Sequence, residues 1–224
     1  MTIKVESIED SNIRSVMYTP RFNQVTDRSL LIETMRANSF AILFGPLGNA
    51  EKAGPQVATH LPLVVQEDGE HGILEGHFAK ANPHWQALAG RETLVVFPGP
   101  HSYVSPSLYA ERISVPTWNY IAIHAYGTLE LIEQEEEKYG LLDRLIQAND
   151  PAYADQWSGL PDNYRRNLLA GIVGFRIPIS RIEGKFKLSQ NRPEVDRRTV
   201  HAVHASGNSD QQALASWMER LAGW

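Results

Sequence analysis

The first recognisable element along the chain is an amphipathic helix. Thr26 or Asp27 can cap its N-terminus, because short polar side chains accept hydrogen bonds from the first free backbone N–H groups. Apolar residues then recur on one helical face at Leu30, Leu31 and Met35, which predicts a helix that ends near residue 38. A short apolar run over 39–44 follows and predicts a buried strand that stops at Gly45-Pro46.

Most of the remaining pattern in the first two thirds is typical of strands. Asp68-Gly69 indicates a hairpin turn between two of them, and Pro98-Gly99-Pro100 closes another. Near the end of the series, Pro178 indicates a bulge or a sheet edge. The predicted strands cover 56–66, 72–78, 92–97, 115–132 and 172–182.

Helices separate and follow these strands. Asn82-Pro83 opens a short one, because Asn suits the N-cap position and Pro the first helical position. Others are predicted over 135–148, over 163–169, after Pro193 and at the C-terminus, where the apolar face carries Leu214, Trp217, Met218 and Leu221. The order predicts an α+β fold that is mainly β, a barrel decorated by helices rather than a doubly wound parallel sheet. We expect one domain over 17–224, preceded by an N-terminal extension over 1–16.

Composition narrows the class of protein. The chain has no cysteine, which excludes disulfides and thiolate chemistry, and it has neither a signal-peptide core nor an apolar stretch of about 20 residues. A cytoplasmic location without membrane contact is therefore the default expectation. The net charge is −5, with 21 basic against 26 acidic residues, whereas proteins that grip DNA phosphates usually carry a basic surplus. Locally, 181–198 holds more bases than acids, which favours an anionic ligand.

Six sequence blocks resemble one family in order and spacing. They read MYTPRFNQ, ATHLPLVV, GHFAKANPHW, GPHSYVSPSLY, VPTWNY and GKFKLSQNRPEVDR, and they span about 17–200. They resemble the PaiB family, described as FMN-binding negative transcriptional regulators with the FMN-binding split-barrel fold. The resemblance implies FMN as cofactor and a homodimer that binds flavin between its subunits. The segment before residue 17 is longer than usual, and 109–115 is a little shorter.

The block GHFAKANPHW carries the best candidate for a phosphate site. Lys80 lies between a strand and the helix opened by Asn82, where a positive charge and free backbone N–H groups suit an anion. The alternative is a surface lysine beside a turn. The resemblance favours the phosphate role and adds His77 to the candidate flavin-binding residues.

The strand ATHLPLVV supplies three further candidates, Thr59, His60 and Leu61. The resemblance implies that this strand lies along the flavin ring. Apolar residues on both of its faces predict a strand that is buried on both sides. We therefore interpret His60 as a hydrogen-bonded core residue in preference to a catalytic one, although it could still contact flavin.

Two later blocks complete the candidate site. Trp118 and Asn119 begin a strand, where the resemblance favours flavin stacking or a dimer interface over core packing alone. Lys187, Ser189 and Gln190 belong to a dense set of hydrogen-bond donors that interrupts an apolar region, and the alternative is a solvated face.

Metal and nucleic-acid sites find little support in the sequence. His201 and His204 lie three residues apart on a predicted helix, but no third ligand stands nearby, so no metal is expected. No helix-turn-helix with a basic recognition helix is present, which makes direct DNA contact doubtful.

Three functions remain open from the sequence. The first is the FMN-binding regulator that the resemblance implies. The second is a flavin-dependent oxidoreductase, which would bind NAD(P)H without a Rossmann site because no GxGxxG motif occurs. The third, less favoured, is a haem protein with a histidine ligand.

Overall fold

The computed structural model describes residues 17–48 and 54–222, so the predicted extension over 1–16 lies outside it. The described strands are β1 (Gln24–Val25), β2 (Phe40–Pro46), β3 (Gln56–Pro62), β4 (Val64–Gln66), β5 (Ile73–Ala79), β6 (Glu92–Val104), β7 (Thr117–Thr128), β8 (Glu130–Ile132) and β9 (Ile172–Lys187). The α-helices are α1 (Arg28–Ala37), α2 (His84–Leu88), α3 (Glu135–Asn149), α4 (Ala154–Ser158), α5 (Asp162–Ala170), α6 (Glu194–Ala205) and α7 (Ser209–Ala222). Short 3-10 turns occur at Arg21–Asn23, Pro106–Leu108 and Pro151–Tyr153.

The strands form one strongly curved antiparallel sheet. Its order is β3-β2-β6-β7-β9-β5-β4, and β1 and β8 also pair with β9. The two ends of this series are consecutive in sequence, because β3 ends at Pro62 and β4 begins at Val64. The chain therefore closes the barrel by bending at Leu63, which is buried and whose backbone N–H donates to the Ser39 carbonyl at 2.9 Å. The predicted single strand over 56–66 is thus two strands.

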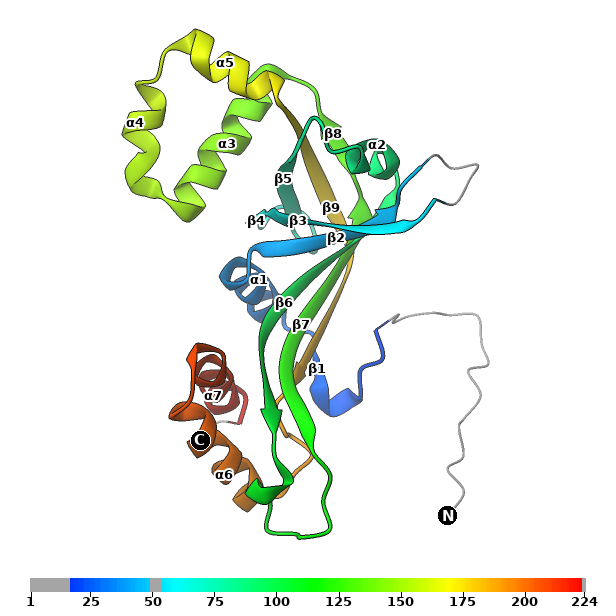
Figure 1. Ribbon diagram of the computed structural model, residues 1–224, viewed down its shortest axis with the longest axis vertical. Helices are drawn as coiled ribbons and strands as arrows, with labels where there is room; N and C mark the ends of the chain where they lie inside the picture. Colours follow the sequence, from blue (N-terminus) through cyan, green and yellow to red (C-terminus); the bar gives the residue numbers. More distant parts are fainter. Residues whose placement is uncertain (1–16, 49–53, 223–224) are drawn as a thin grey trace.

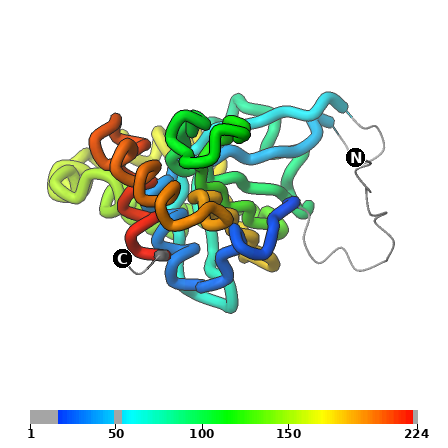
Figure 2. The backbone as a smooth tube through the Cα atoms, turned by 90° about the horizontal axis from the view of Figure 1, so that it is seen from below, coloured from blue at the N-terminus to red at the C-terminus, as the bar shows by residue number. Residues whose placement is uncertain are grey.

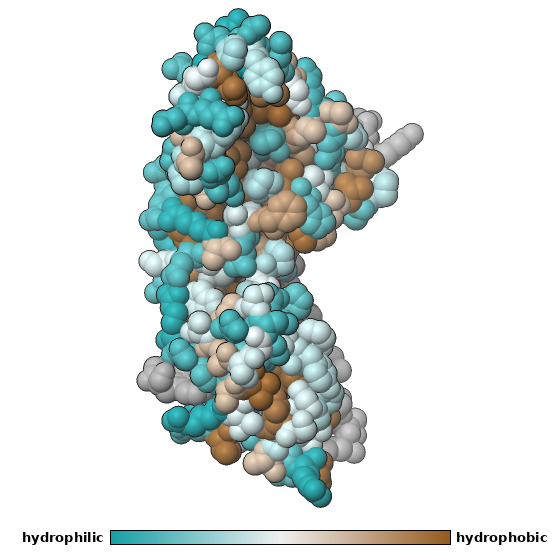
Figure 3. Space-filling model, turned by 60° about the vertical axis from the view of Figure 1, so that its left-hand side comes forward, coloured by the Kyte–Doolittle hydropathy of each residue, from teal (hydrophilic) through white to brown (hydrophobic). Residues whose placement is uncertain are grey.

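Two groups of helices lie on the same side of the long strands (Figure 1). Figure 1 shows α6 and α7 beside one end of the long strands β6, β7 and β9, and the lobe of α3, α4 and α5 at the other end. Seen from below, both groups stay on the same side of the strands (Figure 2). Hydrophilic residues cover most of this helix-bearing side, and hydrophobic residues gather there in separate patches (Figure 3). Around the middle of β6, β7 and β9, the opposite side carries none of the described α-helices (Figure 1).

Large apolar side chains fill the barrel. Phe78, Phe97, Phe175 and Phe186 are among the largest fully buried ones. A smaller cluster of Ile132, Leu141 and Leu145 lies between the barrel and α3. Burying such side chains contributes about 1.5–3 kcal/mol each, so this packing holds the strands and the residues at their ends in place.

Several predicted boundaries are confirmed. Asp27 is the N-cap of α1, since its carboxylate accepts from the Leu30 N–H at 3.0 Å. The turn at Gly69 is present between β4 and β5, and Gly69 has the positive φ of 76° that such a turn requires. Pro193 precedes α6 as predicted. The β7–β9 ladder skips Ser180, two residues after Pro178, so the predicted bulge is present near this proline.

Other predicted strand boundaries were wrong. β6 does not stop at Pro98 but runs on to Val104, because a bulge between Pro98 and His101 absorbs the Pro-Gly-Pro segment. Gly99 permits this continuation, since a Cβ there would lie 2.9 Å from the Ile121 Cβ. The region 115–132 breaks at Leu129 into β7 and β8, and β9 continues beyond residue 182 to Lys187.

Candidate functional site

One group of candidate residues meets where β3 faces the β5–α2 connection. The Thr59 hydroxyl is 2.8 Å from the His84 Nδ1, and the Asn82 amide Nδ2 donates to the same hydroxyl at 3.5 Å. The backbone N–H of His84 donates to the Asn82 Oδ1 at 3.0 Å, which closes the network. We call Thr59, Asn82 and His84 the upper polar cluster. The sequence predicted the first two but not His84, because nothing in its local pattern marks it as buried.

Lys80 lies on the same β5–α2 connection with its side chain exposed. Its backbone is fixed at both polar groups, since its N–H donates to the Gly171 carbonyl at 2.8 Å and its carbonyl accepts from the Trp85 Nε1 at 3.2 Å. The ammonium group is therefore presented to solvent from a rigid backbone. Helix α2 spans only five residues, so its dipole adds little to the charge of Lys80.

Strand alternation divides the candidates on β3. Thr59 and Leu61 point toward the barrel interior and are half-buried, whereas His60 points outward and is exposed. His60 stacks on the exposed Phe40, with ring centroids 6.1 Å apart and planes inclined by 30°. The predicted burial of this strand on both sides is therefore wrong, and His60 is not a core residue. The reason is topological, because β3 is the last strand of the series.

His77 faces the helical lobe instead of the upper polar cluster. It alternates along β5 with the core residue Phe78 and shares its face with Glu75, whose carboxylate accepts from Arg144 of α3 at 2.7 and 3.0 Å. The His77 Nδ1 is buried and has no hydrogen-bond partner among the described residues. Burial lowers the pKa of His77 below its ordinary value.

The second group of candidates lies at the far ends of β7 and β9. Asn119 is fully buried, and its Oδ1 accepts from the Ser189 hydroxyl at 3.0 Å. Its Nδ2 lies 3.4 Å from the Nε2 of His204, which is fully buried on α6. Ser189 has a positive φ of 65°, a conformation that non-glycine residues rarely adopt. These contacts join β7, β9 and α6. The polar groups of Asn119 and Ser189 are therefore hydrogen-bonded within the protein and not offered to a ligand.

Lys187 and Gln190 are also used internally. The Lys187 ammonium donates to the Thr117 hydroxyl and to the Trp118 carbonyl, the latter at 2.8 Å. Burial, followed by the nearby charges of Lys185 and Arg192, lowers the pKa of Lys187. The Gln190 side chain bonds to the backbone just before it, since its Oε1 accepts from the Leu188 N–H at 2.6 Å. We call Trp118, Asn119, Lys187, Ser189 and Gln190 the lower polar cluster.

Trp118 is the exposed member of the lower polar cluster. Half of its surface is accessible, and its ring lies against Tyr103 with centroids 5.9 Å apart and against His101 with centroids 6.2 Å apart. Tyr103 is also 49% exposed. Such an aromatic group on the surface suits a flat ligand or a protein partner.

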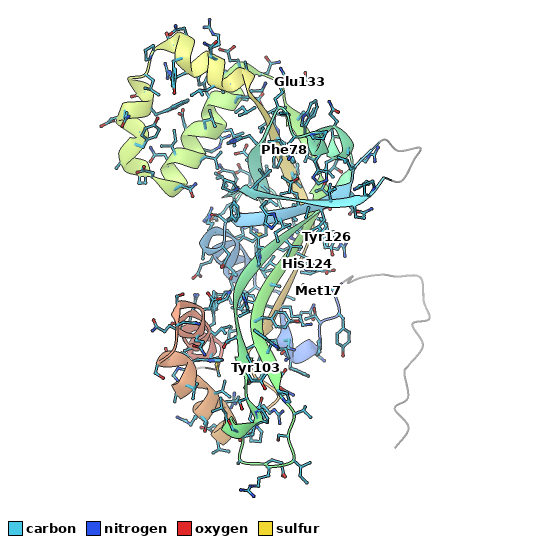
Figure 4. All side chains as sticks on the ribbon, viewed as in Figure 1. Met17, Phe78, Tyr103, His124, Tyr126 and Glu133 are labelled. Carbon is cyan, nitrogen blue, oxygen red and sulfur yellow. The ribbon has the colours of Figure 1, made fainter. Side chains whose placement is uncertain are left out.

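The two clusters lie at opposite ends of the molecule. Gly174 pairs with His77 near the upper cluster, and Lys187 is at the other end of the same strand. At about 3.3 Å per residue, these two positions on β9 are separated by about 40 Å of extended chain. Figure 4 shows the same order, with Phe78 toward one end, Tyr103 toward the other, and His124 and Tyr126 between them. No single small ligand reaches both clusters of one chain.

Between the clusters, the helix-free face of the sheet carries a row of paired residues. The row runs across five strands through His60, Ile42, Val96, His124 and Glu183. We call the outward-facing side of β2, β3, β6, β7 and β9 around this row the open face.

The open face has charged groups that sequence reasoning missed. The Arg181 guanidinium donates to Glu183 at 2.7 Å and lies 3.7 Å from the centre of the Tyr126 ring. Burial lowers the pKa of His124, while the Glu183 charge opposes that change. Burial also raises the pKa of Tyr126. The sequence hid this group because its members belong to two distant strands that meet only in the ladder.

No metal centre is found in the described part of the chain. No group of three or more metal-ligating side chains occurs there. His204 is buried against Asn119, and His201 lies 2.8 Å from Glu219, so the two histidines face different partners. Nor does any helix within 17–48 and 54–222 have the length and hydropathy needed to cross a membrane.

Comparison with solved structures identifies the fold. The chain matches a "Putative 5-nitroimidazole antibiotic resistance protein" of Bacteroides thetaiotaomicron with a TM-score of 0.53 at 15% identity, over 72% of this chain and 85% of that one. It matches the flavocytochrome Anf3 of Azotobacter vinelandii with a TM-score of 0.51 at 14% identity, over 80% of each chain. These likenesses show the fold, which is mixed α and β with a large antiparallel sheet, as predicted.

Sequence comparison identifies the family. The family model "Putative FMN-binding domain" matches residues 17–181. The chain is 36% identical over 208 residues to "Protease synthase and sporulation protein PAI 2" of Bacillus subtilis, covering 91% of this chain and 97% of the relative. It is also 31% identical to an uncharacterized protein of Emericella nidulans, covering 82% and 88%. The protein belongs to the family of the putative FMN-binding domain, and the PaiB resemblance is confirmed.

Proposed function

We propose that this protein binds FMN at the upper end of its barrel. The observation that carries the proposal is the set of groups found together there. The set comprises the exposed positive charge of Lys80 and the half-buried polar groups of Asn82 and Thr59. Phe40 and His60 form an exposed aromatic pair on the opposite, outward face of β2 and β3. A charged phosphate and a polyol are two parts of FMN, and the donors of the first set fit them. When bound, flavin supplies hydride or electron transfer.

The protein functions as a homodimer in this proposal, with the open face as its interface. Phe40, Tyr103 and Trp118 expose 60%, 49% and 51% of their surface on that face. Exposed apolar patches of this kind favour a protein partner, and two-fold dimers are the commonest oligomers. A two-fold axis near the middle of the face sets the upper cluster of one copy beside the lower end of the other. Of the lower polar cluster, only the exposed Trp118 is then offered to the partner copy, because the other members bond within their own chain.

The family resemblance supports a negative regulator of transcription. Direct operator binding is not part of the proposal, because the net charge is −5. The α3–α5 lobe is also acidic, with Glu135, Glu136 and Glu137 in the first turn of α3. Gel retardation of promoter DNA by the purified protein at physiological salt is expected to give weak, sequence-independent binding. Tight, sequence-specific retardation would show instead that the protein contacts DNA by itself.

Titration with two flavins tests the FMN site. Replacing Lys80 by Ala should weaken FMN binding about tenfold to a hundredfold, because a charge-assisted bond to phosphate contributes about 1.5–3 kcal/mol. Riboflavin lacks the phosphate, so its affinity should stay unchanged. Lys138→Ala on α3 is the matched control and should affect neither ligand. The phosphate assignment is wrong if Lys80→Ala weakens both flavins equally or neither.

The alternative function is that of a flavin-dependent oxidoreductase, and the same purified protein can be used to test it. The purified protein is reconstituted with FMN and mixed with NADPH without oxygen. A regulator that only senses flavin should leave the absorbance unchanged over minutes. Rapid bleaching of the flavin band would replace the regulatory assignment with a reductase.

A further inference from the structure

His84 is the buried centre of the upper polar cluster. It is 1% exposed and packs its ring edge-on to Phe78, with centroids 6.2 Å apart. On its other side, a Cβ added at Gly45 would lie 3.4 Å from the ring Nε2. The same Cβ would lie 2.3 Å from the Leu88 Cδ2, so glycine on β2 is what lets α2, and His84 with it, pack this closely.

The contacts of Asn82 fix which way its amide points. Its Oδ1 accepts the backbone N–H of His84, so its Nδ2 must be the atom that faces Thr59. The Thr59 oxygen therefore accepts a hydrogen bond from Asn82. The single hydroxyl proton of Thr59 remains available for one other partner.

His84 accepts a hydrogen bond from the Thr59 hydroxyl when its Nδ1 carries no proton. Burial lowers the pKa of His84, so the ring is neutral at neutral pH and carries one proton. The backbone of Gly45 beside Nε2 raises the pKa, as an acceptor next to a ring N–H does. No hydrogen bond of Nε2 meets the geometric criterion among the described residues, so the Thr59 contact at 2.8 Å is the hydrogen bond of this ring. We infer that the proton resides on Nε2, next to the Gly45 backbone, and that Nδ1 accepts from the Thr59 hydroxyl.

We propose that His84 is a positioning residue that makes Thr59 a pure acceptor toward the bound flavin. This inference rests on the proposed FMN function. Phosphate oxygens at the second ionisation also only accept, so Thr59 cannot serve the phosphate. Thr59 instead takes a ligand O–H, which the ribityl polyol of flavin supplies. The phosphate is left to Lys80 and to the second amide N–H of Asn82.

Two flavins separate this polyol subsite from the phosphate subsite. Thr59→Val, of nearly equal volume, should weaken FMN and riboflavin by the same factor of about five- to tenfold, the loss of one hydrogen bond. Thr59→Ser keeps the hydroxyl and should restore both affinities. If Thr59→Val weakens FMN and leaves riboflavin unchanged, Thr59 contacts the phosphate and the inference is overturned.

The role of His84 has its own readouts. In protein labelled with 15N-histidine, the nitrogen shifts of His84 should show Nε2 protonated and Nδ1 bare, with or without flavin. His84→Asn places a carbonyl near the position of Nδ1 and should retain both affinities, whereas the folded His84→Leu should weaken both flavins like Thr59→Val. A protonated Nδ1 contradicts the inference. If wild-type protein binds no flavin, the proposed function fails, while the nitrogen shifts still decide the proton position.

Discussion

Ser189 offers a test of whether the lower polar cluster holds the fold or a ligand. Its buried hydroxyl donates to the buried Asn119 Oδ1, so Ser189→Ala leaves that oxygen without a donor. An unsatisfied buried acceptor costs about 1–3 kcal/mol, and we take about 2 kcal/mol. Since 1 kcal/mol shifts the melting temperature of a protein this size by about 2–4 °C, the Ala variant should melt about 4–8 °C lower.

Ser189→Gly is the matched variant. It loses the same hydrogen bond, but glycine adopts the positive φ of 65° without steric cost, which should recover roughly 0.5–1 kcal/mol after its larger unfolded-state entropy is counted. Thermal melts followed by circular dichroism should therefore rank wild type above Gly and Gly above Ala. FMN affinity of the folded variants should stay within about twofold of wild type. An Ala variant with unchanged melting temperature and lost FMN affinity would refute the reasoning and make Ser189 a ligand contact.

Three further predictions follow from the described contacts. Sedimentation should give about twice the 25.1 kDa chain mass, and Trp118→Asp should shift the protein to monomer; a wild-type monomer would contradict the dimer. Arg144→Met should lower the free energy of unfolding by about 2 kcal/mol, less than for a fully buried pair because Arg144 is 40% exposed. Arg198→Met, which removes a surface pair with Glu194, should leave the urea midpoint unchanged in the same titration, and an equal loss in both variants would contradict this. Burial lowers the pKa of His204 below its ordinary value of 6.5, so on acidification the unfolded chain binds a proton at this residue before the folded chain does. The free energy of unfolding should therefore be constant above pH 6.5 and fall below it. Equal urea midpoints at about pH 8 and about pH 5.5 would exclude this effect.

Local chemistry made several elements predictable from sequence. Asp27 caps α1 and Pro193 precedes α6 because both act within one helical turn of their own position. The turn at Gly69 and the bulge near Pro178 are likewise set by the conformations that these two residues allow or forbid. The prediction that residues 17–224 form one domain is not tested by these observations.

The candidate site was predictable only in part. Lys80 and Asn82 share one connection, so the sequence could place them together at the start of α2. The network between Thr59 and His84 joins residues that are far apart in sequence, and only the packing of α2 on Gly45 brings them within 2.8 Å. For His60 the sequence predicted burial that the structure does not show. Its apolar neighbours suggest a buried strand, but they cannot reveal that β3 is the last strand in the series.

The sequence by itself therefore determined the family, the class of fold and the donors on single loops, because these depend on residues close in the chain or on whole blocks. Tertiary structure decided that β6 crosses Pro98-Gly99-Pro100 and that the lower polar cluster bonds internally to His204. It also decided that the two clusters lie at opposite ends of β9. The physical reason is that ladder register and helix docking bring together residues from distant parts of the chain, and each side chain's partner follows from that pairing rather than from its own neighbours.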